Sequence, residues 1–218
     1  SFDSAIAKDG RIMHLAASST PLIGAKQVQM IAKTLKGEGE VAILSAASTM
    51  TNQNSWIAAM KDEWKKPEYS KMPLVATVYG DDQDDKSYRE MQALVKAHPN
   101  LRGVISPTTI GIRSGAKAIM DGGLIGKVYI TGLGLPSEMK AAVLAGACDS
   151  FAIWNPVEYG YAATMIMAGI LGGKNAGPGS TISMGKKGDT KIDDTGEGVV
   201  GPPFEFNKSN VEEFAKIF

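Results

Sequence analysis

The amino-acid sequence predicts an α/β fold built on a doubly wound, mostly parallel sheet. Short apolar runs alternate with longer stretches of helical periodicity, and this alternation is typical of βαβ units. Glycine pairs at Gly122-Gly123 and Gly172-Gly173 follow two of the helical stretches, as glycine does where helices end. With 218 residues, 44% of them hydrophobic, the chain can bury a sizeable core in one large domain or two lobes.

Six apolar runs are predicted as buried strands, because each is short, mostly apolar and separated from the next by a helical pattern. They lie at residues 12–17, 41–45, 74–79, 103–106, 128–131 and 150–154. Parallel strands joined through helices make right-handed crossovers. We therefore expect every strand-to-helix loop to lie at one edge of the sheet.

Six helical patterns follow these strands. They lie at residues 24–35, 55–65, 86–97, 110–121, 137–145 and 157–171. Beyond them, residues 172–201 are rich in glycine, lysine and aspartate, which predicts loops with short strands in a small antiparallel appendage. Residues 202–206 are predicted as an edge strand, and residues 207–218 as a short terminal helix.

The composition excludes several classes of partner. Lysine plus arginine and aspartate plus glutamate each number 23, so the formal net charge is zero. A general attraction to nucleic acid or to an anionic membrane is therefore not expected. The single cysteine, Cys148, excludes an internal disulfide and a multi-cysteine metal site.

Polar, uncharged side chains dominate the predicted loops at the sheet edge. The clearest case is residues 45–56, which follow the second strand and contain Asn52, Gln53 and Asn54 without any charge before the next helix. Ligands of open α/β sheets bind at the carboxyl ends of the strands. Because carboxamides both donate and accept hydrogen bonds, this loop suits a neutral ligand with many hydroxyl groups.

Each of these features also has a purely structural interpretation. Asn52 can cap the following helix, although three consecutive carboxamides are more than one cap needs. Trp56 and Trp154 either offer flat apolar faces to a ligand or pack in the core. The acidic residues 81–85 have part of the spacing of a calcium loop, but acidic residues also favour the start of a helix. We favour the helical interpretation and predict no metal site.

The sequence contains no convincing catalytic motif. Ser137 and Lys140 match an S-x-x-K pattern, yet its companion motifs are absent and Ser137 after Pro136 is better explained as a helix N-cap. His14 and His98 have no partner spacing for zinc, and no glycine motif for phosphate or dinucleotide is present. The motifs therefore nominate no catalytic residue and no cofactor.

Eight short motifs, spread over nearly the whole chain, occur together in one known family. They are Asp3-Ser4, Thr20–Gly24, Ala42–Ala46, Thr51–Trp56, Tyr79–Asp82, Pro107–Thr109, Thr131–Met139 and Ile153–Pro156. In combination they resemble the sugar-binding proteins of bacterial ABC importers. The closest resemblance is to the rhamnose-binding and autoinducer-2-binding branch of the type I periplasmic binding proteins.

This resemblance implies a two-lobed, Venus-flytrap fold that closes on its ligand at a hinge. Residues 1–19 would end the N-terminal lobe and cross the hinge, and residues 20–149 would form the C-terminal α/β lobe. Residues 150–218 would contain further hinge crossings, an N-lobe helix at 157–171 and a C-terminal appendage. Most of the first lobe would lie outside this chain, on a separate fragment or in a part lost by proteolysis. Helix 157–171 would then expose an apolar face.

The resemblance also implies a set of ligand contacts. They are Asp3, Asn52, Gln53, Pro107, Thr109 and Asn155. Autoinducer-2 binders have aspartate where this chain has Asn52, and alanine where it has Thr109. These two differences favour a neutral sugar such as a deoxyhexose.

The implied function is that of the periplasmic solute-binding component of a bacterial ABC importer. It would bind a rhamnose-like deoxyhexose, or a related pentose or hexose, in the cleft between the lobes and would deliver it to a membrane permease. This function makes the protein a binding protein and not an enzyme. Three alternatives stay open: an autoinducer-2 binding protein of the same branch, the core of a LacI-type sugar-responsive regulator, and a small-molecule enzyme on a doubly wound sheet. The lack of a catalytic constellation argues against the enzyme.

Overall fold

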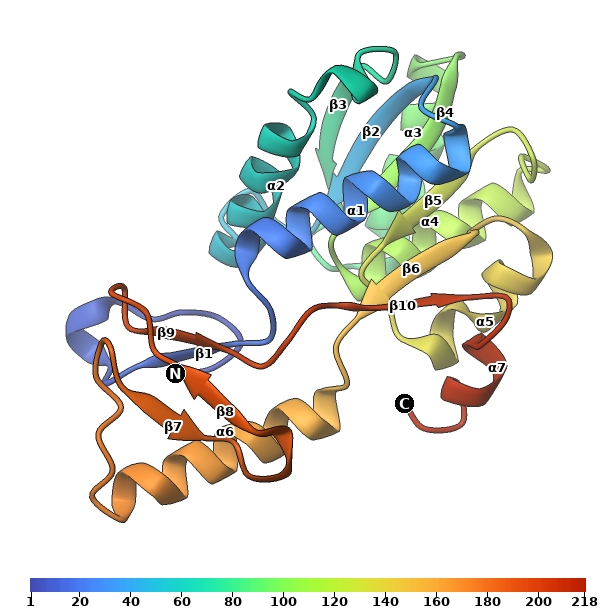
Figure 1. The fold of residues 1–218 in the computed structure, drawn as a ribbon. Helices are drawn as coiled ribbons and strands as arrows, with labels where there is room; N and C mark the ends of the chain where they lie inside the picture. Colours follow the sequence, from blue (N-terminus) through green and yellow to red (C-terminus); the bar gives the residue numbers. More distant parts are fainter. The chain divides into compact units, whose positions relative to one another are not determined.

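The computed structural model describes all of residues 1–218, which form two compact units (Figure 1). Unit 1 comprises Ser1–Leu22 and Trp154–Pro203, and unit 2 comprises Ile23–Ile153 and Phe204–Phe218. Each unit is therefore assembled from two separate segments of the chain. No helix has both the length and the apolar composition needed to cross a membrane.

Unit 2 contains the parallel sheet that the sequence predicts. Four parallel strands are arranged in the order β3-β2-β4-β5. The strands of this unit are β2 (Glu40–Ser45), β3 (Leu74–Tyr79), β4 (Leu101–Ser106), β5 (Tyr129–Gly132), β6 (Ser150–Ile153) and β10 (Phe204–Asn207). The central strand β2 is buried apart from its first residue, which is why its sequence is almost continuously apolar.

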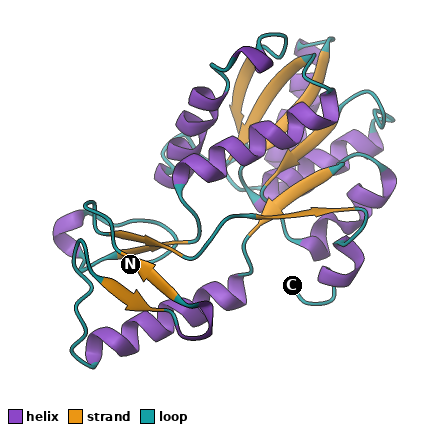
Figure 2. Cartoon of the chain, in the orientation of Figure 1, coloured by secondary structure: helices purple, strands orange, loops and turns teal.

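Helices cover both faces of this sheet (Figure 2). The helices of this unit are α1 (Thr20–Leu35), α2 (Thr51–Glu63), α3 (Asp84–Ala97), α4 (Thr109–Asp121), α5 (Pro136–Ala145) and α7 (Val211–Phe214), with a 3-10 turn at Pro67–Tyr69. The last of them, α7, packs beside α5 and β10. Helix α1 lies so close to β4 that a side chain at Gly103 would meet Ile31. On the other face, a side chain at Gly115 of α4 would meet Ile130 of β5. These close contacts confirm the doubly wound arrangement.

The end of the chain completes unit 2. Strand β10 pairs antiparallel with β6, and β6 adjoins the parallel sheet through a bridge between Ala152 and Leu133. The rings of Phe206 and Phe151 stack with their centroids 5.3 Å apart, and Phe206 is 1% exposed. This aromatic packing holds residues 204–218 on unit 2, although residues 154–203 belong to unit 1.

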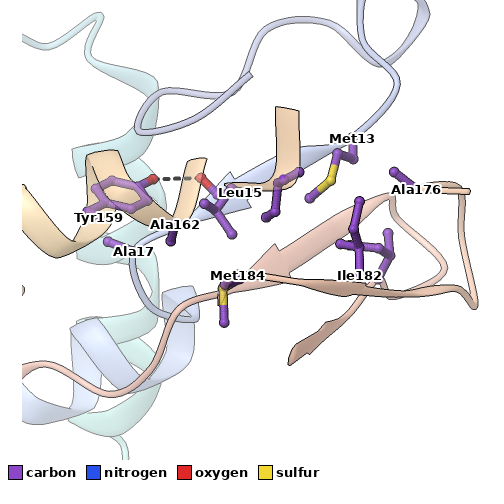
Figure 3. Close-up of a cluster of buried hydrophobic side chains, with 10 residues drawn as sticks. Met13, Leu15, Ala17, Tyr159, Ala162, Ala176, Ile182 and Met184 are labelled. Atoms are coloured by element: carbon purple, nitrogen blue, oxygen red, sulfur yellow. Dashed lines mark hydrogen bonds between the residues drawn. The ribbon is translucent and has the colours of Figure 1, made fainter. Parts of the chain in front are cut away.

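Unit 1 has its own small core. Its elements are a 3-10 turn at Lys8–Gly10, β1 (His14–Ala16), α6 (Pro156–Leu171), β7 (Thr181–Ser183), a 3-10 turn at Gly185–Lys187, β8 (Asp189–Lys191) and β9 (Glu197–Val199). Strand β1 pairs parallel with β9, while β7 and β8 form an antiparallel hairpin. Figure 3 shows side chains of this core, including Leu15, Tyr159 and Ile182. The predicted antiparallel appendage is thus the β7–β8 hairpin.

Several predicted boundaries were wrong. The first strand is shorter than residues 12–17 and does not belong to the main sheet, since it pairs with β9. Helix α2 begins at Thr51 and not at residue 55, so the carboxamides lie in a helical turn and not in a loop. The terminal helix is a single turn, Val211–Phe214. The predicted N-cap Ser137 is also wrong: Leu135 occupies the cap position and Pro136 begins α5.

Candidate ligand-binding site

The four parallel strands of unit 2 bring their carboxyl ends to one edge of the sheet. These ends are Ser45, Tyr79, Ser106 and Gly132, each followed by a segment that leads into a helix. Backbone hydrogen bonds connect neighbouring segments: Gly80 N–H donates to Ser45 O (2.8 Å), and Leu133 N–H donates to Ser106 O (3.0 Å). These bonds hold the segment after β3 against the end of β2, and the segment after β5 against the end of β4.

Two predicted contact residues lie in the first turn of α2. Gln53 is 6% exposed, and its Oε1 accepts hydrogen bonds from Ser45 Oγ (2.7 Å) and from Ala46 N–H (2.9 Å). Asn52 is half-buried, and its Oδ1 accepts the Gln53 N–H (2.8 Å). Asn54 instead donates to Ser48 O (2.8 Å). The neighbouring carboxamides thus have different roles, and none is the N-cap, which is Met50.

The other two predicted contacts of unit 2 follow β4, the neighbour of β2. Pro107 is buried, and Thr109 is the half-exposed first residue of α4. Ser106 Oγ donates to Leu44 O of β2 (2.7 Å), which fixes the two strand ends side by side. The structure therefore brings Asn52, Gln53, Pro107 and Thr109 to the same edge, as the sequence predicts for loops of a parallel sheet.

The segment after β3 is attached to this edge through a side chain that sequence reasoning missed. Thr108 Oγ1 donates to Asp82 Oδ1, and Thr108 is 6% exposed. Asp81 and Asp82 both have left-handed backbone conformations, with φ of 52° and 50°. Such conformations are uncommon outside glycine and occur at functional sites. The consecutive aspartates were the available signal, because aspartate tolerates this conformation better than most residues.

Asp3 and Asn155, the remaining predicted contacts, lie in unit 1. Asp3 is exposed, with a left-handed φ of 67°. Its backbone N–H donates to Tyr159 Oη (2.7 Å). Asn155 is the N-cap of α6, and its Oδ1 accepts from Val157 N–H (2.9 Å) and Glu158 N–H (3.3 Å).

Tyr159 supports Asp3 from the core of unit 1. Its hydroxyl also donates to Leu15 O at 2.6 Å, the dashed line in Figure 3. Burial raises the pKa of this phenol well above its ordinary value, so the hydroxyl stays protonated and can donate at any physiological pH. Sequence reasoning missed this role, since a tyrosine in an apolar helix is typical of core packing.

The other candidates found in the sequence have structural roles. Trp56 is 8% exposed within unit 2, and Trp154 packs against the core of unit 1 with its ring edge-on to Tyr159 (6.4 Å). In the acidic segment, Asp81 forms an ion pair with Lys86 (2.5 Å), and no three metal-binding side chains gather anywhere. Burial raises the pKa of the Cys148 thiol far above its ordinary value, so this cysteine is not a reactive nucleophile.

Comparison with known proteins identifies the family. A family model described as a periplasmic binding protein domain matches residues 1–175. The chain belongs to the periplasmic binding protein family. Members of this family are substrate-binding proteins of ABC transporters that act outside the cytoplasm. The protein is therefore a binding protein and not an enzyme.

Solved structures agree with this assignment. A sugar ABC transporter protein from Actinomyces odontolyticus is 38% identical, with a TM-score of 0.86 over 98% of this chain and 69% of its own. A solute-binding protein from Clostridium phytofermentas, solved with bound L-rhamnose, is 35% identical, with a TM-score of 0.92 over 100% of this chain and 72% of its own. LsrB from Clostridium saccharobutylicum, in complex with AI-2, shares the fold at 20% identity and a TM-score of 0.87, over 98% of this chain and 73% of its own.

Proposed function

We propose that this periplasmic binding protein binds a neutral monosaccharide, with a rhamnose-like deoxyhexose as the first candidate, and delivers it to the permease of an ABC importer. Asn52, Gln53, Pro107 and Thr109 contribute contacts from unit 2. Asp3 and Asn155 of unit 1 are further contacts, proposed from the family resemblance. The observation that carries the proposal is the pair Asn52 and Gln53, which present carboxamides at the carboxyl edge of the sheet.

The chemistry of this pair supports a hydroxylated ligand. Both carboxamide oxygens are already bonded to backbone N–H groups, so each side chain offers its amino group for a further hydrogen bond. A sugar hydroxyl accepts such a bond while donating its own hydrogen elsewhere. A ligand lacking that oxygen would leave a largely buried amino group unpaired, which is the usual basis of selectivity in sugar sites.

Similarity supports rhamnose ahead of autoinducer-2. The relative solved with L-rhamnose is 35% identical, whereas the relative solved with AI-2 is 20% identical and supports the fold alone. This chain also has Asn52 and Thr109 where the resemblance to autoinducer-2 binders implies aspartate and alanine. We keep autoinducer-2 as an outcome of the binding test.

Unit 1 supports a further part of the proposal, namely that additional polypeptide covers it in the working protein. Val157, Met167 and Leu171 of α6 are 68%, 56% and 81% exposed. An apolar groove of about 100 Å³ lies nearby, lined by residues that include Phe2, Met13, Ile166 and Ile170. Strong binding of a hydrophobic dye by the 218-residue chain would support this, and dye binding no greater than that of a compact monomer would contradict it.

Calorimetric titration tests the proposed function. L-rhamnose, D-arabinose, other neutral pentoses and hexoses, and autoinducer-2 are titrated into the purified protein and into an Asn52→Ala variant. We expect one sugar to bind with one-to-one stoichiometry and Asn52→Ala to weaken it at least tenfold. Asn100→Ala is the matched control, because Asn100 is exposed and directly precedes β4, at the opposite edge of the sheet. Equal affinities in wild type and Asn52→Ala would contradict the site.

A further inference from the structure

The orientation of the Gln53 carboxamide is determined by its surroundings. Ala46 N–H can only donate, so the Gln53 atom that it contacts at 2.9 Å is the oxygen Oε1. Ser45 Oγ lies 2.7 Å from the same oxygen and donates a second hydrogen bond to it. The amino group Nε2 has no hydrogen-bond partner within the protein, and it is not among the fully buried polar atoms that lack one. Gln53 is therefore fixed with its donor end available.

The second group that contacts Gln53, Ser45, is buried and its backbone is hydrogen-bonded. Ser45 is the last residue of β2 and is fully buried, at 0% exposure. Its backbone oxygen accepts a hydrogen bond from Gly80 N–H (2.8 Å), so the loop that follows the neighbouring strand β3 holds the Ser45 peptide in place. Such a buried, well-anchored partner is what preorganises a binding group.

We propose that Ser45 is a positioning residue that makes Gln53 a donor-only contact and so selects ligands with an oxygen acceptor at this point. The inference rests on the proposed sugar-binding function and deepens it. A ring oxygen, a carbonyl oxygen or a hydroxyl oxygen satisfies Gln53 Nε2. A protonated amine has only donors and is rejected here, so amino sugars carrying the amine at this position bind more weakly than their hydroxyl counterparts.

The test has one arm that needs no ligand. In the ligand-free protein, ¹⁵N relaxation reports the mobility of the Gln53 side-chain NH₂ group, whose signals are assigned by their loss in Gln53→Ala. We expect an order parameter typical of a rigid group, about 0.8, and a clear fall toward about 0.6 in Ser45→Ala. Ser70→Ala, an exposed serine that precedes β3 near the opposite edge, leaves the value unchanged. An equally rigid amide in Ser45→Ala overturns the inference.

The second arm is a double-mutant cycle on sugar affinity. Ser45→Ala weakens binding of the best sugar about fivefold in the wild-type background, the effect of about one hydrogen bond. In the Gln53→Ala background it changes affinity less than twofold, because Ser45 acts through Gln53. Equal losses in both backgrounds would show that Ser45 acts independently and would overturn the inference. If Ser45→Ala loosens the amide but no sugar binds the wild type, the proposed function fails while the positioning of Gln53 by Ser45 is upheld.

Discussion

Gln53 Oε1 accepts a hydrogen bond from the backbone N–H of Ala46, seven residues earlier in the chain, at 2.9 Å. This bond ties the first turn of α2 back to the end of β2. It also satisfies the Ala46 N–H, a buried backbone donor directly after the end of β2. The same side chain therefore anchors the strand-to-helix connection and presents an amino group at the candidate site.

Gln53→Ala is expected to destabilise the fold as well as the site. The substitution leaves the buried Ser45 hydroxyl and Ala46 N–H without an acceptor, which costs about 1–3 kcal/mol. Urea denaturation measures the change in free energy of unfolding. Gln83→Ala is the matched control, since Gln83 is an exposed carboxamide before α3, and it is expected to change stability by less than about 0.5 kcal/mol. Equal stabilities of the two variants would refute the anchoring role.

Tyr159→Phe is expected to weaken unit 1 and release Asp3. It removes a hydroxyl that bonds both Leu15 O and Asp3 N–H within a buried cluster, at a cost of about 1–3 kcal/mol. Hydrogen exchange should show faster exchange of the Asp3 amide. Tyr161→Phe, which loses only a 3.2 Å bond from the exposed Lys186 N–H, serves as the control. Unchanged exchange at Asp3 would mean that Tyr159 does not hold this residue.

Gly132→Ala is expected to disrupt the carboxyl edge. Gly132 has a left-handed φ of 146°, and an added Cβ would lie 1.8 Å from Ser106 O. The backbone of Gly132 or of Ser106 would have to move, so we expect a loss of about 3 kcal/mol or more in the free energy of unfolding. Gly126→Ala separates strain from collision, since Gly126 has a φ of 80° with no atom near its Cβ position and should lose only about 1 kcal/mol. A similar loss of stability in both variants would show that the collision with Ser106 does not contribute.

Glu63 is expected to contribute acid sensitivity. Burial alone would raise its pKa, but hydrogen bonds outweigh this effect and lower the pKa below its ordinary value of 4.5. The bonding partners are Lys66 (2.7 Å), Tyr69 (3.0 Å) and Gln29 (3.2 Å). Because the folded-state pKa is depressed, the stability from this carboxylate is present above pH 4.5 and is lost as pH falls through the folded-state pKa. Glu63→Gln should therefore be less stable at pH 7 and lose less stability on acidification. A parallel pH profile for both proteins would rule this out.

Local sequence pattern accounted for the sheet of unit 2 because its strands are short, apolar and separated by helices. Residues 74–79 of the prediction coincide with β3, and residues 41–45 lie within β2. The pattern failed for β1, whose partner β9 lies about 180 residues away, because no local signal specifies such a distant pairing. It also failed at the start of α2, where Asn52 has a weak local preference for helix and Gln53 is fixed by its contact with the end of β2.

The candidate site was predictable only in outline. Polar residues after parallel strands indicated the edge, and Asn52, Gln53, Pro107 and Thr109 do lie there. Burial divided their roles in a way that residue types do not reveal, since Asn52 is half-buried and Gln53 is almost fully buried. The supporting residues Ser45 and Thr108 were not predictable, because a hydroxyl at a strand end does not indicate its partner.

Native mass spectrometry tests the central claim most directly. The protein is incubated with L-rhamnose and with a panel of neutral monosaccharides, and the mass of each complex is compared with that of the free chain. The sugar-binding account predicts a mass increase of one monosaccharide per chain for at least one sugar, with the complex strongly reduced in Asn52→Ala and retained in Asn100→Ala. A complex that forms equally in all three proteins, or no complex with any sugar, would contradict it.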